Sequence, residues 1–326
     1  MRTVYIASLS RSGSTFLQLL LSSHPEIVGL GEIAHVIKTG GVPTARQAAG
    51  GSDGSCTCGH PAADCEFWAP LMPEMAQSDE HALHRNILAR FKEQFPDKLL
   101  LDSSKSEKQF AKYYLQPDSG AGDLRVIFLI RDFRGWVRSV QKHVRKTPGG
   151  SFIYRSYLAT SYLWYLKNRS IMQMLRRSGV SFLCVSYENL VFHLDEEVER
   201  ILRFLDVGQV PPGDLDLGKA VMHELFGSPT IRSSTRHRSQ VVYDQSWFCD
   251  LRYVVRSPLM LPVLHFNHQV HTKLAKDRHK SGPASGMPVC QESCASRPAS
   301  SASDSCTDTK TSPVALAECG RAVAKD

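Results

Sequence analysis

Hydrophobic segments of two kinds alternate along the first two thirds of the chain. Short runs rich in aliphatic and β-branched residues predict strands, and they are Thr3–Ser8, Lys98–Asp102, Arg125–Ile130 and Ser181–Ser186. Helical periodicity begins at Ser14 or Thr15, resumes after Asp132, and extends over about Tyr154–Ser178 and Asp195–Leu205. Strands separated by helices are typical of a parallel sheet with right-handed crossovers. We therefore expect an α/β fold whose central parallel sheet is flanked by helices.

The remaining segments lack this regular alternation. Residues 40–65 are rich in Gly, Ala and Cys and predict a loop excursion that could lie over a site. From about residue 276 the composition shifts to Ser, Ala, Pro, Thr and Lys, which is typical of disorder. We expect one domain over residues 1–275 and a disordered, low-complexity tail over residues 276–326.

Composition and charge narrow the classes of protein. The chain has 326 residues, of which 42% are hydrophobic, so it can bury a full core. Its formal net charge of +7 suits a polyanionic ligand. The sequence contains no block of Lys and Arg interleaved with aromatic residues, which is the pattern typical of nucleic-acid binding. Residues 1–7 run directly into a β-pattern without a leader, and the apolar runs are far shorter than the roughly 20 residues of a membrane span. We expect a cytoplasmic protein with no membrane span and no nucleic-acid partner.

The first strand leads into a candidate phosphate loop. Ser8–Gly13 is a short loop of mostly small residues between that strand and the helix that opens with Ser14 and Thr15. In this P-loop-like arrangement, backbone N–H groups and a helix N-terminus bind phosphate, although a plain helix cap would look the same. No Lys follows Gly13, as a nucleotide kinase would require, and the basic residue Arg11 precedes it instead. The apolar strand that ends at Asp102 is similar to the strand that carries the Walker B acid of kinases, so a kinase remains an alternative.

A second motif follows the strand Arg125–Ile130. Arg131 leaves the end of that strand, and Ser139 lies about two turns into the following helix. A guanidinium and a hydroxyl at this spacing can converge on one phosphate. An Arg131–Asp132 pair at a strand end is also compatible with a structural salt bridge.

Together these motifs resemble the PAPS-dependent sulfotransferases, where PAPS is 3′-phosphoadenosine 5′-phosphosulfate. The segment from Ser10 to Leu17 resembles the 5′-phosphosulfate loop in the Arg form of tyrosylprotein sulfotransferases and many bacterial members, and Arg131–His143 resembles the 3′-phosphate motif with Phe133 in place of Pro. The resemblance covers about residues 1–260. It implies PAPS as co-substrate, no metal requirement, and a set of donor-binding residues: Arg11, Ser12, Gly13, Ser14, Thr15, Phe16, Arg131 and Ser139.

Two further segments resemble the same family. Val185–Val191 resembles the Y-E-D-L segment, which implies that Tyr187 contacts the nucleotide. His223–Arg232 resembles a stretch that closes over the donor in bacterial members, with Ser228 in place of Asn, and it implies a donor contact from Arg232.

The resemblance also implies catalytic residues. The stretch from His24 to Glu32 is similar to an H-P-x-x-x-x-x-G-E stretch of tyrosylprotein sulfotransferases, which assigns the general base to Glu32 and leaves Glu26 solvated. Arg11 is expected to neutralise charge on the leaving oxygen, and Lys105, which follows Asp102-Ser103-Ser104, to act as a second cation. A histidine base, His35 or His143, remains an alternative.

The nine cysteines do not form a disulfide framework, because the number is odd and four lie in the predicted tail. Within residues 40–65, Cys56, Cys58, His60 and Cys65 could on paper bind zinc, but C-x-C is a poor spacing and buried thiols or a local disulfide remain alternatives.

The expected function is transfer of a sulfuryl group from PAPS to an acceptor hydroxyl or amine by in-line displacement. The acceptor could be a small molecule, a carbohydrate or a peptide, and the sequence carries no readable code for it or for the oligomeric state. A catalytically inactive nucleotide-binding module is the alternative outside enzymes.

Overall fold

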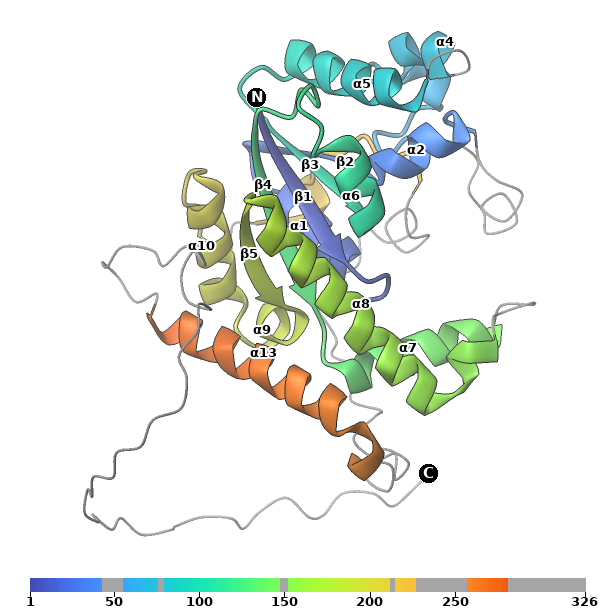
Figure 1. Ribbon diagram of the computed structural model, residues 1–326. Coiled ribbons are helices and arrows are strands. Elements are labelled where there is room, and N and C mark those ends of the chain that lie inside the picture. Colours follow the sequence, from blue (N-terminus) through green and yellow to red (C-terminus); the bar gives the residue numbers. More distant parts are fainter. Residues whose placement is uncertain (43–54, 76–78, 147–151, 212–214, 227–256, 281–326) are drawn as a thin grey trace, which may run out of the picture. The chain divides into compact units, whose positions relative to one another are not determined.

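Five parallel strands form the centre of the protein in a computed structural model, which describes residues 1–42, 55–75, 79–146, 152–211, 215–226 and 257–280 (Figure 1). The strand order is β2-β3-β1-β4-β5. The strands are β1 (Arg2–Ser8), β2 (Ile27–Gly31), β3 (Leu99–Lys105), β4 (Asp123–Ile130) and β5 (Ser181–Ser186). The expected α/β fold with a central parallel sheet is confirmed.

Helices flank the sheet (Figure 1). The α-helices are α1 (Ser14–Ser22), α2 (Ile33–Thr39), α4 (Met72–Met75), α5 (Glu80–Gln94), α6 (Glu107–Tyr113), α7 (Phe133–Lys146), α8 (Tyr157–Ser178), α9 (Tyr187–Phe192), α10 (Leu194–Leu205) and α13 (Leu261–Lys280). Short 3-10 helices are η1 (Ala62–Asp64), η2 (Ala69–Leu71), η3 (Phe152–Arg155), η5 (Leu217–Lys219) and η6 (Ser257–Met260).

The alternation of side chains in β1 divides the core into two layers. Val4 and Ile6 point into one hydrophobic cluster with the buried leucines of α1 and the apolar face of α10. Tyr5 and Ala7 point into the other cluster, to which α5, α6, α7, α8 and α13 contribute. Both faces of the central strand are therefore buried, as expected for a parallel sheet covered by helices.

The four predicted strands are present, and the sheet contains one strand that the pattern of the sequence did not predict. This strand, β2, pairs with β3 in parallel from Ile27 opposite Leu99 to Gly31 opposite Asp102. Glu32 follows it directly and precedes α2. The edge strand β2 thus places Glu32 at the same end of the sheet as the phosphate loop.

The predicted helices are also present, with one boundary shifted. Tyr154 belongs to η3, and α8 begins at Tyr157 because the Ser156 hydroxyl caps its first turn by accepting from the Ala159 amide at 3.3 Å. The described residues belong to one unit within Met1–Cys290. Most of the predicted tail, from residue 281, lies outside them.

Candidate functional site

A residue predicted for the site lies at the end of each of the five strands or directly after it. In the spatial order of the strands these residues are Glu32 after β2, Lys105 at the end of β3, the loop Arg11–Gly13 after β1, Arg131 after β4 and Tyr187 after β5. All strands are parallel, so these positions lie along the carboxyl edge of the sheet. Ligands of open α/β sheets bind at this edge.

The phosphate loop is held in an unusual backbone conformation. Arg11 and Gly13 both have positive φ angles, 74° and 96°. Gly13 precedes the first turn of α1, and no side chain among the described residues caps that turn. The first amide groups of α1 are thus left for an external acceptor, which is the property of an anion site at a helix N-terminus. Ser12 and Ser14 are buried, and Thr15 and Phe16 are half-buried.

The two predicted phosphate motifs meet in space. The Arg11 Nε donates to the Ser139 hydroxyl at 3.0 Å, and Arg131 Nη1 donates to the Arg11 carbonyl at 3.3 Å. The Trp136 indole from α7 also donates to the Ser10 carbonyl at 2.8 Å. The segment after β4 therefore holds the segment after β1 by side-chain contacts to its backbone.

Positive charge is concentrated where these segments meet. Partial burial lowers the pKa of Arg11, and the nearby charge of Arg131 lowers it further. The Arg131 Nε is buried and has no hydrogen-bond partner among the described residues. Two neighbouring guanidinium groups and an uncapped helix terminus form a site that fits an anionic group, since an anion would offset their repulsion and satisfy the free donors.

Tyr187 forms one wall of this site. Its ring lies against the Arg131 guanidinium, with the Arg131 Cζ 4.6 Å from the ring centroid. A Cβ atom at Gly13 would lie 2.4 Å from the Tyr187 Cδ2, so the ring also packs against the glycine of the loop. The sequence predicted each of these residues separately, and the structure brings them into contact.

Two buried carboxylates, Asp132 and Glu188, form hydrogen bonds with the segment that follows β4. Asp132 receives two hydrogen bonds from the Arg134 side chain, at 2.9 and 2.8 Å, and one from Asn267 of α13 at 2.9 Å. Burial raises the pKa of Asp132, but the hydrogen bonds and charge of Arg134 outweigh it, so the pKa lies below its ordinary value. Glu188 accepts from the Asp132 amide at 3.1 Å, and burial raises the pKa of Glu188. The Arg131–Asp132 pair suggested by the sequence is replaced by an Asp132–Arg134 pair.

Glu32 and Lys105, which the sequence predicted separately, form an ion pair. Lys105 has a positive φ of 71° and lies opposite Ala7 of β1 in the register of the sheet. The first turn of α2 is held next to this pair, because the Ala34 amide donates to the Ser104 hydroxyl at 3.0 Å. A carboxylate and an ammonium group thus stand beside the phosphate loop, on the β2 side of the sheet.

Asp102, which belongs to the same strand as Lys105, is structural. It is buried, and it accepts from the Ser104 amide at 2.8 Å and from the Tyr114 hydroxyl at 2.7 Å. Burial raises the pKa of Asp102 to about 6. A carboxyl group occupied in this way differs from the metal-binding acid of a kinase, which must face the nucleotide.

The remaining predicted residues have other contacts or lie outside the described residues. The alternative base His35 packs edge to face against Phe226 at 5.3 Å, and His143 is on the exposed side of α7. Glu26 is not simply solvated, since it accepts from the Gly208 amide at 2.8 Å and pairs with Arg2 at 3.3 Å. Arg232 lies outside the described residues.

Sequence reasoning missed a buried polar chain behind Glu32. Gln18 of α1 donates to Glu224 at 2.8 Å and accepts a hydrogen bond from Ser103 of β3. Glu224 in turn packs against Gly31, where a Cβ atom would lie 2.4 Å from the Glu224 Cγ. Gln18 occupies an apolar helix face and could have been noticed there, whereas Glu224 carries no local signal.

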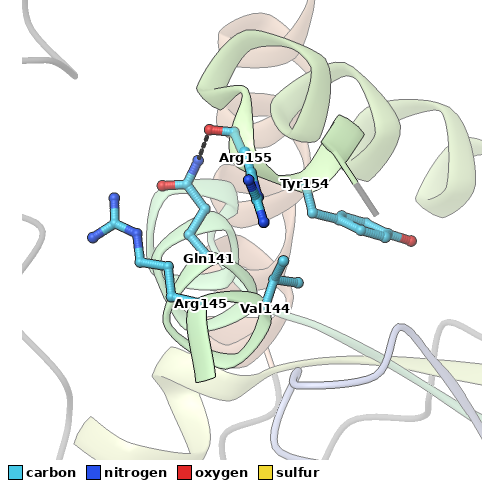
Figure 2. Close-up of a pocket in the computed structure, with 5 residues that line it drawn as sticks. All are labelled: Gln141, Val144, Arg145, Tyr154 and Arg155. Atoms are coloured by element: carbon cyan, nitrogen blue, oxygen red, sulfur yellow. Dashed lines mark hydrogen bonds between the residues drawn. The ribbon is translucent and has the colours of Figure 1, made fainter. Parts of the chain in front are cut away.

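A separate pocket of about 310 Å³ lies between the last turns of α7 and η3 (Figure 2). Gln141, Val144 and Arg145 line it from α7, and Tyr154 and Arg155 line it from η3, with Gln141 donating to the Arg155 carbonyl at 3.3 Å (Figure 2). It contains none of the residues predicted for the site, so it is separate from the phosphate loop.

Comparison with known proteins identifies the family of the chain. The sequence profile of the sulfotransferase family matches residues 3–211, and the chain belongs to this family. No curated protein matches the chain. None of the helices among the described residues is both long and apolar enough to cross a membrane.

Solved structures of sulfotransferases are similar to the chain at low identity. A sulfotransferase domain of the Synechococcus PCC 7002 olefin synthase is 20% identical, covers 76% of this chain and 91% of its own, and has a TM-score of 0.47. A sulfotransferase domain of the curacin biosynthetic pathway is 15% identical, with coverages of 79% and 97% and a TM-score of 0.45. A sulfotransferase from Alicyclobacillus acidocaldarius is 14% identical, with coverages of 82% and 96% and a TM-score of 0.39.

Proposed function

We propose that this sulfotransferase uses PAPS as its donor and transfers the sulfuryl group to an acceptor hydroxyl or amine. The observation that carries the proposal is the convergence of Arg11, Arg131 and Ser139 on the uncapped N-terminus of α1. PAPS carries a phosphosulfate and a separate 3′-phosphate, and this cluster offers cationic donors for both. Arg131 and Ser139 bind the 3′-phosphate, and the loop Arg11–Phe16 binds the phosphosulfate.

The roles of the two arginines follow from their positions. Arg131 is buried against the Tyr187 ring, so it is preorganised to bind a fixed phosphate. Arg11 is more exposed and lies on the loop that follows β1, where it reaches the bridging oxygen of the phosphosulfate. It therefore neutralises the negative charge that develops on the leaving oxygen.

The transfer itself is an in-line displacement. The acceptor oxygen forms a bond to sulfur while the bond from sulfur to the bridging oxygen breaks, which leaves adenosine 3′,5′-bisphosphate. Glu32 takes the proton of the acceptor. The Lys105 ammonium, which forms an ion pair with Glu32, stabilises charge on the sulfuryl oxygens.

Three substitutions separate donor binding from proton transfer. We expect Arg131→Ala or Ser139→Ala to weaken binding of adenosine 3′,5′-bisphosphate, because each removes a phosphate donor. We expect Glu32→Gln to leave this affinity unchanged and to lower turnover about 100-fold or more. Binding is measured by calorimetry, and turnover with labelled PAPS in a screen of carbohydrate, phenol, peptide and amine acceptors.

Glu26→Gln is the matched control, because Glu26 and Glu32 flank the same strand at opposite ends. It removes a carboxylate from the amino end of β2 and should retain turnover. Full turnover of Glu32→Gln, with the sulfated product confirmed by mass, would show that another group is the base.

The kinase alternative is tested with the same protein. The buried and hydrogen-bonded Asp102 argues against a magnesium-bound nucleotide at this site. A magnesium-dependent preference for ATP over adenosine 3′,5′-bisphosphate would overturn the assignment of PAPS. Bisphosphate binding without turnover on any acceptor would instead identify an inactive nucleotide-binding module.

A further inference from the structure

A second cluster of reactive side chains lies away from the phosphate loop. It consists of three cysteines, Cys56, Cys58 and Cys65, together with His223, and one potential ligand atom from each residue lies within 4.8 Å of those of the others. Cys56 and Cys65 are buried, His223 is half-buried and Cys58 is exposed. We propose that this cluster is a structural zinc site with three thiolate ligands and one imidazole ligand.

The distances within the cluster fit tetrahedral zinc. Two sulfurs bound tetrahedrally at about 2.3 Å lie about 3.8 Å apart, and a sulfur and a nitrogen lie about 3.6 Å apart. The Cys58 and Cys65 sulfurs are separated by 3.6 Å. The His223 Nδ1 lies 3.3 Å from the Cys65 Sγ and 3.8 Å from the Cys56 Sγ. Since all four ligand atoms lie within 4.8 Å of one another, side-chain movements of up to about 1 Å would complete the coordination.

Ligand chemistry also selects zinc over harder cations. Thiolates and imidazole suit zinc, whereas magnesium and calcium require oxygen ligands. Four protein ligands leave no open position for water, which is the arrangement of a structural and not a catalytic site. The exposed Cys58 provides a route by which the ion enters.

The backbone around the cluster is fixed by several hydrogen bonds. The Cys56 amide donates to the His60 carbonyl at 2.8 Å, which folds residues 56–60 into a tight turn that directs two thiols to the same side. The Thr57 amide donates to the Glu224 carbonyl at 3.0 Å, and the Thr57 hydroxyl accepts from the Glu224 amide at 2.9 Å. This turn is thereby bound to the segment that contains His223.

His223 is held from its other side as well. Its amide donates to the Gly29 carbonyl of β2 at 2.8 Å, and the Trp68 indole donates to its carbonyl at 2.6 Å. Phe67 and Phe95 pack against its ring at 5.7 and 5.8 Å. The imidazole therefore has a defined position before any ion binds, as a preorganised metal site requires.

The proposed ion would join three parts of the chain. It links the turn at residues 56–60, the segment around Cys65 and residue 223, which is 158 positions further along the sequence. Closing a loop of this length stabilises the folded state, because the unfolded chain loses the corresponding freedom. Glu224, the neighbour of His223, packs beside Gly31 and thus near Glu32, so the ion would stabilise the β2 side of the site.

The sequence pattern alone pointed to a different fourth ligand. His60 follows Cys58 closely, but it is exposed and is not one of the four residues whose ligand atoms meet. This difference provides a sharp test. His223→Ala removes a proposed ligand, whereas His60→Ala removes a histidine from the same turn without removing a ligand.

The experiment uses the full chain, purified under reducing conditions without a histidine tag. We expect about one zinc per chain by elemental analysis. Cobalt added to the metal-free protein should bind with an endpoint of one equivalent and give the intense visible bands of tetrahedral coordination together with thiolate charge-transfer bands. His223→Ala and Cys58→Ser should lower zinc affinity at least about 100-fold, since even loss of a residue that only supports a ligand costs about 10- to 100-fold.

His60→Ala and Cys184→Ser are the controls and should keep one zinc. Cys58→Ser is the variant that best avoids misfolding, because its side chain is exposed. If variants at buried positions fail to fold, the cobalt titration of the unmodified chain decides alone. Each readout is independent of sulfuryl transfer and of bisphosphate binding.

Three results would overturn the proposal. The reduced protein could fail to bind zinc or cobalt, His60→Ala could abolish binding while His223→Ala preserves it, or mass analysis of the native protein could find Cys58 joined to Cys65. The last result would identify a disulfide, which requires the two sulfurs to approach from 3.6 Å to about 2.05 Å.

Discussion

Gly13 is the position in the phosphate loop where the structure gives the sharpest prediction. Its φ is +96°, and an added Cβ would lie 2.4 Å from the Cδ2 and 2.8 Å from the Cε2 of Tyr187. Gly13→Ala therefore incurs two costs. The backbone conformation disfavours a side chain by about 1 to 2 kcal/mol, and the overlap with a packed ring adds about 1 to 3 kcal/mol.

The two costs can be measured separately because the chain offers a matched glycine. Gly179, at the end of α8, has a φ of +70°, and apart from its chain neighbours and its own helix no atom of the described residues lies within 4 Å of its added Cβ. Gly179→Ala should lower the free energy of unfolding by the backbone cost alone, about 1 to 2 kcal/mol. The excess for Gly13→Ala, measured by urea denaturation, is then the steric cost.

Tyr187→Ala completes a double-mutant cycle. Because the overlap is with the Tyr187 ring, Gly13→Ala should cost about 1 to 3 kcal/mol less in the Tyr187→Ala background than in the parent chain. Equal costs of Gly13→Ala and Gly179→Ala, or additivity of Gly13→Ala and Tyr187→Ala, would refute the packing of this ring on the loop. Either result would also contradict the assignment of the Tyr187 ring as one wall of the proposed donor site.

Two further predictions concern the supports of the site. Burial raises the pKa of Asp102 from 3.8 to about 6, so the folded state binds more protons than the unfolded state between these values and stability falls as pH rises through them, by about 3 kcal/mol in total. Asp102→Asn does not titrate, so its free energy of unfolding relative to the parent should rise by about 1 to 2 kcal/mol between pH 5 and pH 8 in urea titrations, and a constant difference would contradict the raised pKa. Trp136→Phe removes the 2.8 Å hydrogen bond to Ser10 and should weaken bisphosphate binding by about 1 kcal/mol, roughly fivefold, in calorimetry; an unchanged affinity would show that this bond does not position the loop.

The meeting of Arg11, Arg131 and Ser139 could be predicted from the sequence because the signals of both motifs are local. Each phosphate motif is a buried strand followed at once by a loop and a helix, so the strand positions the next few residues. Arg11 and Arg131 come from separate motifs, and the pairing of β1 with β4 brings them together. The contact of the Arg11 Nε with the Ser139 hydroxyl followed from two such local units on neighbouring strands.

The surroundings of Glu32 were harder to predict because the strand that precedes it has a weak pattern. Two of the five residues of β2 are glycines, which have low strand propensity, so the pattern of the sequence did not predict this strand. The segment was singled out only because it ends next to Glu32. Packing explains both glycines. An added Cβ would lie 2.4 Å from the Ser22 Oγ at Gly29 and 2.4 Å from the Glu224 Cγ at Gly31.

The same close approach explains why the cysteine cluster could not be assembled from the sequence. Residues 221–223 bond to β2 at Gly29, through its amide to the Val221 carbonyl at 3.1 Å and through its carbonyl to the His223 amide at 2.8 Å. A side chain at Gly29 would also press on Met222, whose Cγ would lie 3.3 Å from the added Cβ. The glycine that weakens the strand pattern therefore admits the segment that carries His223 to the three cysteines. A motif search within residues 56–65 selects His60 because it considers neighbours in sequence, whereas the proposed fourth ligand, His223, comes from the segment that fits beside the edge strand β2.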